Sequence, residues 1–474
     1  MKSMNQASKF QQLSVITLSA VLFTGTAALG LGALSSLGQA NLLKGTELAE
    51  QSLAPIKAPI DYEARIAQGD QLFDRRNFGM AAMQYGLAIP IQEENPLAYA
   101  KLGKAYLADG NAAKALEALN TATSLDPSNR EYTVLKGIAL LRNKDYEGAK
   151  ALLSPIQDHQ GALFYTGLIQ AQLGDHANAK KSFEAAQKIT GSIPAQNINA
   201  FLAVYTTFDA QTEGQGIYLN ALLIQALLDT GEFTMASDLA VQTLNQESEY
   251  RDVWIMLGYA HLKLKEAAQA EDAFKQAAHL DPLKPETHYF LGVAQWDQKK
   301  FEDAENSFEL ALLHNFQPES QAYRKLAESQ LALQKYEDAL ASYEHLNIID
   351  GSTDFILRPI WISINILKDL DRASSFAEDN ISKNPNDAQS HAALAWVKLS
   401  KGDEVEASTA INTALILDDK SPSAHFVAGL IEESKGNKQS AQSYYNNAYQ
   451  LAETDDWLRT EAANRYNALA TAAS

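Results

Sequence analysis

The sequence predicts an all-α protein built from one short helix pair that is repeated along most of the chain. Three observations support this fold class. Alanine recurs about every 34 residues, a small residue stands twelve positions before most of these alanines, and a bulky side chain stands four positions after most of them. Turn-forming pairs such as Asp109–Gly110 and Asp281–Pro282 separate the helices. A repeat of this length indicates helix pairs that contact only their neighbours.

The recurring alanines set the register of eleven repeats. They are Ala81, Ala115, Ala149, Ala179, Ala236, Ala270, Ala304, Ala339, Ala373, Ala407 and Ala441. The small residues twelve positions earlier are Gly69, Gly103, Gly137, Gly167, Gly258, Gly292, Ala327, Ala395 and Gly429, and the two exceptions are Ile224 and Trp361. The bulky residues four positions later are Tyr85, Leu119, Leu153, Phe183, Phe274, Phe308, Tyr343, Ile411 and Tyr445. We expect small residues on the two helices to face each other, with the bulky residue filling the groove beside them.

This pattern resembles the tetratricopeptide repeat, and the resemblance extends over residues 62–455. It implies a solenoid of about eleven antiparallel helix pairs in a right-handed superhelix, with a concave groove that binds other proteins. The predicted repeats are 62–95, 96–129, 130–159, 160–193, 217–250, 251–284, 285–319, 320–353, 354–387, 388–421 and 422–455.

The predicted organisation divides these repeats into two lobes. In chain order the segments are an anchor or signal peptide at 1–43, a linker at 44–61, a four-repeat lobe at 62–193, an inserted helix and hinge at 194–216, a seven-repeat lobe at 217–455, and a capping helix and tail at 456–474. We expect the repeat at 354–387 to be degenerate, because Trp361 occupies a position that needs a small residue.

The N-terminal residues predict a hydrophobic helix and, with it, an exported protein. Lys2 and Lys9 precede residues 15–38, which carry no charge. Because about 20 such residues cross a bilayer, we expect an uncleaved anchor that contacts the membrane through this segment. A long signal peptide cut near Ala40 is the alternative. The positive charges predict a single-pass protein of the bacterial inner membrane with its repeats in the periplasm, or a periplasmic or secreted protein after cleavage.

Composition narrows the classes of partner and chemistry. A formal net charge of −19 and a pI near 4.9 argue against nucleic acid, whose phosphates need clustered Lys and Arg. The chain has no cysteine, which excludes disulfides, thiolate metal sites and a cysteine nucleophile. Since no catalytic or phosphate-binding motif is present, we expect no enzyme activity, cofactor, metal or small-molecule substrate.

Three histidines share one place in the repeat. His288, His391 and His425 stand at the fourth position, where Trp254 stands in its own repeat. The matched placement predicts partly buried packing rather than metal binding. No two of the histidines have the local spacing of a metal site on a helix.

The resemblance places positions five, nine and twelve of each first helix in the concave groove. The residues expected there to bind a partner are Ile255, Tyr259, Leu262, Tyr289, Val293, Trp296, Trp396 and Phe426. Their apolar and aromatic character suits an amphipathic helix or an extended peptide, and equally suits packing between adjacent repeats. Position nine carries no asparagine in any repeat, so the clamp with which some family members grip the acidic C-termini of chaperones is not expected.

These features together predict a non-enzymatic scaffold for protein–protein interactions. Its expected setting is the assembly of a bacterial cell-envelope system of the polysaccharide-export, secretion or pilus type. Two alternatives are open: a periplasmic chaperone-like binder of extended clients, and a carbohydrate-binding solenoid that stacks sugars on Tyr259, Trp296 and Trp396.

Overall fold

A computed structural model describes residues 61–210, 216–349, 355–452 and 456–471. These residues form 24 α-helices and no strand, which confirms the all-helical fold class. The predicted N-terminal hydrophobic helix lies outside the described residues.

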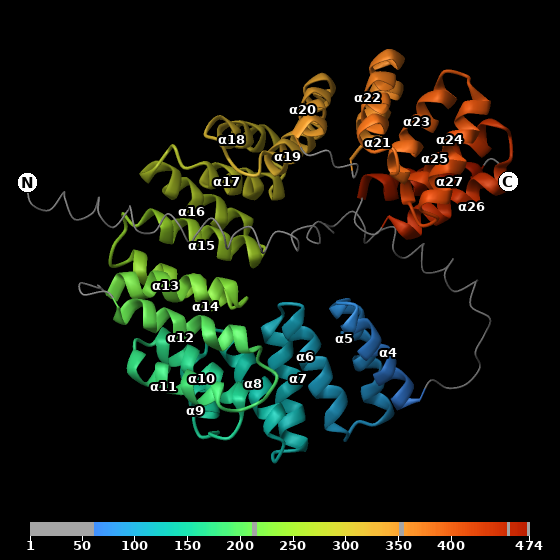
Figure 1. The fold of residues 1–474 in the computed structure, drawn as a ribbon. Coiled ribbons are helices and arrows are strands. Elements are labelled where there is room, and N and C mark those ends of the chain that lie inside the picture. Colours follow the sequence, from blue (N-terminus) through green and yellow to red (C-terminus); the bar gives the residue numbers. More distant parts are fainter. Residues whose placement is uncertain (1–60, 211–215, 350–354, 453–455, 472–474) are drawn as a thin grey trace, which may run out of the picture. The chain divides into compact units, whose positions relative to one another are not determined.

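The described residues divide into two compact units with the boundary between Leu280 and Asp281. The first unit contains α4 (Tyr62–Asp74), α5 (Phe78–Ala88), the 3-10 turn η2 (Ile89–Ile91), α6 (Pro96–Ala108), α7 (Ala112–Leu125), α8 (Arg130–Arg142), α9 (Tyr146–Leu153), α10 (Gln160–Gln172), α11 (His176–Gln187), α12 (Ala195–Asp209), α13 (Gly216–Asp229), α14 (Phe233–Leu244), α15 (Arg251–Lys263) and α16 (Ala267–Leu280). Within it, successive helices pack against one another in chain order (Figure 1).

The second unit continues the same pattern of helix pairs. It contains α17 (Pro285–Asp297), α18 (Phe301–Leu313), α19 (Glu319–Ala332), α20 (Tyr336–Ile349), α21 (Leu357–Trp361), the π-helical segment η3 (Ile362–Leu367), α22 (Leu370–Lys383), α23 (Ala388–Ser400), α24 (Glu404–Leu417), α25 (Pro422–Ser434), α26 (Lys438–Leu451) and α27 (Asp456–Thr471). The division into lobes at 194–216 does not coincide with the boundary between the units, and it stays a prediction.

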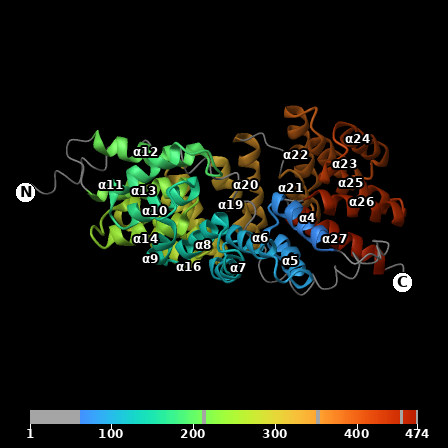
Figure 2. The same cartoon turned by 90° about the horizontal axis from the view of Figure 1, so that it is seen from below.

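A single unpaired helix, α12, interrupts the alternation of pairs in the first unit. It contacts both α11 and α13 (Figure 2). Its Phe201 is fully buried and stacks on Phe183 of α11, with ring centroids 5.0 Å apart and an interplanar angle of 13°. The extra helix thereby covers the apolar side of the fourth repeat before the next pair begins.

The helix pairs close around the recurring alanines. All eleven of these alanines are completely buried. The glycines twelve positions earlier lie against the bulky residue of the same pair. A Cβ placed on Gly258 would lie 2.7 Å from the ring of Phe274, and the same distance separates a Cβ on Gly292 from the ring of Phe308. The bulky residue therefore packs straight onto the glycine backbone.

The turn inside each pair ends on a residue in the left-handed region, at position fifteen of all eleven repeats. Glycine fills it in five repeats, as at Gly231 with φ +81°, and a long polar residue fills it in six, as at Lys265 with φ +63°. A left-handed residue just after a helix lets the terminal carbonyl groups find hydrogen-bond donors. Residues with a Cβ reach this conformation at a cost of about 1–2 kcal/mol.

The repeat at 354–387 departs from the regular pair. Its first helix begins as α21, which has only five residues, and continues as η3, after which Lys368 takes φ +58°. Trp361 ends α21, where the other repeats except the one containing Ile224 carry glycine or alanine. Inserting a side chain of this size between two close helices favours a wider helical turn over a regular one.

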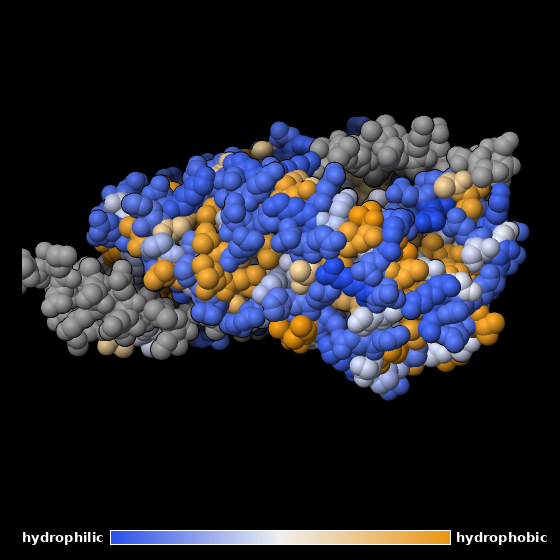
Figure 3. All heavy atoms as spheres, turned by 90° about the horizontal axis from the view of Figure 1, so that it is seen from above, coloured by the Kyte–Doolittle hydropathy of each residue, from blue (hydrophilic) through white to orange (hydrophobic). Residues whose placement is uncertain are grey.

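The predicted membrane location is contradicted. Among the residues that the structure describes, no helix is both long and apolar enough to cross a membrane. The longest of them, α27, has 16 residues, whereas a bilayer span needs about 20. Residues 15–38, on which the single-pass prediction rested, lie outside the described ranges. The face shown in Figure 3 is mostly hydrophilic, with small separate apolar patches.

Candidate peptide-binding faces

Five of the eight residues predicted to bind a partner are buried inside the protein. Tyr289 stacks on Phe316 with ring centroids 4.2 Å apart, and Trp396 meets the edge of Phe426 at 5.6 Å. The buried five are Ile255, Tyr259, Tyr289, Trp396 and Phe426, each at most 6% exposed. These five residues pack in the core between adjacent repeats, which was the alternative to partner binding. Of the eight residues, only the half-buried Leu262, Val293 and Trp296 are therefore accessible to a partner.

In the first unit, charged residues end the first helices of two neighbouring pairs. Asp229 is the last residue of α13, and its Oδ1 accepts a hydrogen bond of 2.8 Å from Nε2 of Gln225. Lys263 is the last residue of α15, and its Nζ lies 5.1 Å from the centre of the Tyr259 ring. Such a cation–π contact leaves the ammonium free to take an anionic partner.

Removal from bulk water shifts the pKa of each of these groups. It raises the pKa of the Asp229 carboxyl, an effect that the Gln225 hydrogen bond partly offsets, and lowers the pKa of the Lys263 ammonium. It also raises the pKa of Tyr259 to about 12, with a smaller contribution from the charge of Asp229. Both charged groups are nevertheless partly accessible to solvent.

The second unit has a similar arrangement on α17 and α19. Lys325 places its Nζ 4.7 Å above the half-buried ring of Trp296 and forms an ion pair of 2.7 Å with Glu328. Burial raises the pKa of Asp297, the residue after Trp296, although the charge of Lys325 acts in the opposite direction. The indole Nε1 of Trp296 is buried and has no hydrogen-bond partner. An apolar ring, two acids and one base thus share this face.

The sequence analysis missed these charged residues because it considered positions five, nine and twelve only. Asp229, Lys263 and Asp297 all stand at position thirteen of their repeats. A signal was available, since a charge at one register position in three successive repeats is unusual for a buried helix face. Position thirteen follows the last apolar groove position, where the side chain can reach solvent.

A pocket of about 300 Å³ lies between the first two pairs, but its groups pair with one another. Asp70 accepts hydrogen bonds of 2.7 Å from the hydroxyl of Tyr85 and from the Nζ of Lys101. The carboxylate is therefore already satisfied. No group of three or more histidine, aspartate or glutamate side chains within the described ranges is placed to hold a metal ion.

The ring residues at position four hold the turns between repeats. Nε1 of Trp254 donates to the carbonyl oxygen of Ser248 at 2.8 Å, six residues earlier. His288, His391 and His425 place Nε2 at 2.7–2.8 Å from the carbonyl oxygens of Pro282, Pro385 and Asp419, at the same separation in sequence. Since a carbonyl only accepts, each histidine donates its Nε2–H there. Tryptophan and histidine are thus equivalent at this position, which accords with their predicted packing role.

Known protein families were compared with this chain in sequence. Profiles described as tetratricopeptide repeat match residues 100–155, 161–189, 222–285, 289–346 and 422–455, together about half of the chain. No curated protein matches the chain in sequence.

Solved structures with a similar arrangement are distant. The crystal structure of the APC/C hetero-tetramer Cut9–Hcn1 shares 12% identity over 90% of this chain and 98% of its own, with a TM-score of 0.33. Yeast Tom70 shares 15% over 87% and 96%, with a TM-score of 0.31. YrrB, described as a TPR protein with an unusual peptide-binding site, shares 15% over 48% and 99%, with a TM-score of 0.29. Likeness at this level adds nothing to the repeat profiles. On those profiles, the chain belongs to the tetratricopeptide repeat family.

Proposed function

We propose that this protein is a non-enzymatic scaffold that binds an extended segment of another protein along the ends of its first helices. One observation carries the proposal: the solvent-accessible charged residues Asp229, Lys263 and Asp297 end the first helices of three successive repeats, next to half-buried apolar side chains. A ligand that supplied opposite charges would form ion pairs with them.

The chemistry of these faces indicates what the segment carries. In the first unit Lys263 would take a carboxylate, and Asp229 would take a lysine, an arginine or a backbone N–H. The half-buried Leu262 beside Lys263 supplies an apolar contact. In the second unit Val293 and Trp296 supply apolar contacts next to Asp297. The matching ligand is therefore an extended peptide with apolar residues between charges of both signs.

The alternatives predicted from the sequence gain no support from the described residues. Sugar stacking needs an open ring face, but Tyr259 and Trp396 are only 6% and 4% exposed, and Lys325 lies over the ring of Trp296. The cell-envelope setting stays a prediction, because it was suggested by residues 1–43, which lie outside the described residues. A chaperone-like binder would use the same faces with less selectivity.

Selection from a displayed library of random peptides tests the proposal. A peptide selected on the full chain is measured by fluorescence anisotropy against wild type, Trp296→Ala and Lys263→Glu. We expect at least one of the two variants to weaken binding roughly ten-fold or more, depending on which face the peptide uses. Tyr466→Ala is the matched control, since Tyr466 is a 38% exposed aromatic residue on α27. Failure to select any peptide, or equal binding by all four proteins, would refute the proposal.

A further inference from the structure

The exposed side of α5 carries a row of large apolar residues. Met80, Met83 and Leu87 are 44%, 47% and 43% exposed. Their spacing of three and four residues places them in one row, which we call the α5 stripe. Ile91, just past the end of the helix, is 46% exposed and extends it. An apolar row of this size on a soluble protein usually marks a contact surface.

The other repeats show that this row is not a property of the fold. Two positions after the recurring alanine, where the first repeat has Met83, no other repeat has a large apolar residue. The residues there are Glu117, Ala151, Lys181, Asp238, Asp272, Asn306, Ala341, Ser375, Thr409 and Ser443. The position is therefore polar or small wherever it faces water, and α5 departs from the rule.

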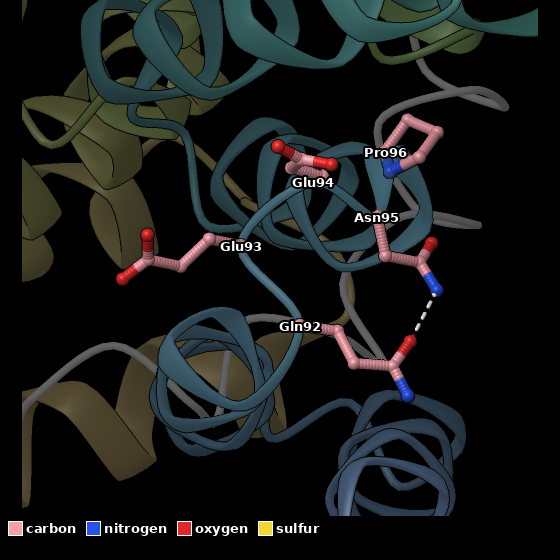
Figure 4. A pocket seen from close by; sticks show the side chains of 5 residues that line it. All are labelled: Gln92, Glu93, Glu94, Asn95 and Pro96. Carbon is pink, nitrogen blue, oxygen red and sulfur yellow. Dashed lines mark hydrogen bonds between the residues drawn. The ribbon is translucent and has the colours of Figure 1, made fainter.

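Opposite charges lie at the two ends of the α5 stripe. Arg75 and Arg76 come just before the cap residue of α5, and Glu93 and Glu94 follow η2 beyond its other end. All four are exposed, and none has an ion-pair partner within the part of the chain that the structure describes. The two carboxylates point in different directions from the turn that a hydrogen bond of 2.9 Å between Gln92 and Asn95 holds (Figure 4).

The α5 stripe is complementary to itself when one copy is turned by 180°. Pairing α5 antiparallel with α5 of a second chain places Met83 near the two-fold axis and Met80 opposite Leu87 of the other copy. The arginines of each copy then meet the glutamates of the other. Gly79 and Gly86 flank Met83, and a Cβ on either would have no atom within 4 Å, so methionine side chains of the second copy can settle there.

We infer that the protein forms a two-fold symmetric dimer through the α5 stripe. The row covers on the order of a few hundred Å² on each copy, at the lower end of specific interfaces, so the dimer is weak and its dissociation constant is micromolar or higher. Methionine suits such a contact, because its flexible thioether adapts to the opposing surface.

Sedimentation velocity on the full chain tests this inference. We expect the weight-average mass to rise above the 51.8 kDa of one chain as concentration increases to about 200 µM, and Met83→Glu to hold it at that value. Ile416→Glu is the matched control, since Ile416 is 84% exposed on α24, and it should dimerise like wild type. Circular dichroism checks that both variants fold. A wild type that stays monomeric, or a Met83→Glu variant that still dimerises, would overturn the inference.

A charge swap and a disulfide cross-link test how the two copies are arranged in the dimer. Arg75→Glu with Arg76→Glu should weaken the dimer roughly ten-fold, and adding Glu93→Arg with Glu94→Arg should restore it. Because the chain has no cysteine, Met83→Cys gives a single thiol at the axis, which should form a disulfide-linked dimer under mild oxidation. Ile416→Cys should not. Failure of the charge swap to restore dimerisation, or equal cross-linking at both positions, would exclude this arrangement of the two copies.

Discussion

The neighbouring pairs α13–α14 and α15–α16 place their large and small core residues on opposite helices. α15 carries Gly258 and α16 carries Phe274. At the corresponding positions α13 carries Ile224 and α14 carries Ala240, both completely buried. One large and one small side chain are needed in each pair, but either helix can supply the large one. Each pair therefore fixes a total side-chain volume rather than a residue type at each position.

The repeat at 354–387 shows the limit of this exchange. It pairs Trp361 with the completely buried Ala377, again with the large residue on the first helix. Isoleucine leaves α13 regular, whereas tryptophan accompanies the short α21 and the π-helical segment η3. The indole of Trp361 is half-buried and meets the edge of Trp457 with ring centroids 6.0 Å apart.

Removing the large residue from α13 should have the largest effect. Ile224→Gly leaves two small residues facing each other, and we expect it to lower the free energy of unfolding by about 4 kcal/mol, from the cavity and from the helix propensity of glycine. Adding Ala240→Phe recreates the arrangement of the next pair and should recover more than half of the loss. Urea unfolding followed by circular dichroism measures both. If the second change only adds to the damage, the volume argument fails.

Adding a large residue to α15 tests the opposite case. Gly258→Leu forces its side chain against the ring of Phe274, and we expect a loss of about 2–3 kcal/mol. Gly86→Leu on α5 is the control, because a Cβ there has no atom within 4 Å and should leave stability unchanged or higher. Urea midpoints distinguish the two. A loss at Gly86 as large as the loss at Gly258 would show that close packing against Phe274 is not the cause.

Substitutions in the turns of the same two pairs should have smaller effects on stability. Gly231 and Lys265 occupy the same left-handed position. Lys265→Gly removes the strain of a Cβ and should stabilise by about 0.5–1 kcal/mol, after the greater freedom of glycine in the unfolded chain is subtracted. Gly231→Ala should destabilise by about 1 kcal/mol. Thermal melting of the two variants checks the signs, and a destabilised Lys265→Gly would contradict the reasoning.

The smallest expected effect concerns Asp229. Because burial raises its pKa above the ordinary 3.8, the folded protein holds this proton more tightly than the unfolded chain does. The favourable contribution is therefore present at low pH and is lost as pH rises through the raised pKa. Asp229→Asn should melt slightly higher than wild type at about pH 7 and equally at about pH 3. The exposed Asp272→Asn is the control, and a wild type that melts higher at neutral pH would contradict the sign.

The sequence was sufficient to predict the repeats, because tight packing leaves a periodic trace. Every alanine chosen from the spacing is completely buried, from Ala81 to Ala441. Which residues remain accessible was harder to predict. Burial of Trp396 and Phe426 depends on how adjacent repeats stack, and the spacing of residues within one repeat does not encode that stacking. The α5 stripe became visible only once exposure was known, whereas the charges at position thirteen could have been found from their shared place in three successive repeats.

The membrane prediction failed for a different reason. It rested on the hydropathy of residues 15–38 alone, whereas the described helices are short, and each buries one face against neighbouring helices. The exchange of large and small residues between paired helices was not predicted from the sequence. Ile224 and Trp361 were each compared with the glycine of other repeats, and not with the residue at the corresponding position of the second helix. Reading the two positions as a pair would have found it.

The irregular start of the repeat at 354–387 also has a consequence for the order in which the protein loses structure. Contacts in a helical array run between neighbours, so opening one pair removes support from the next on each side. The interrupted backbone of α21 and η3 makes this pair the weakest place within the second unit. Hydrogen exchange should therefore be fastest among the amides of Leu357–Leu367 and slower toward α17 and α25, so that heat or a protease enters the second unit from its middle.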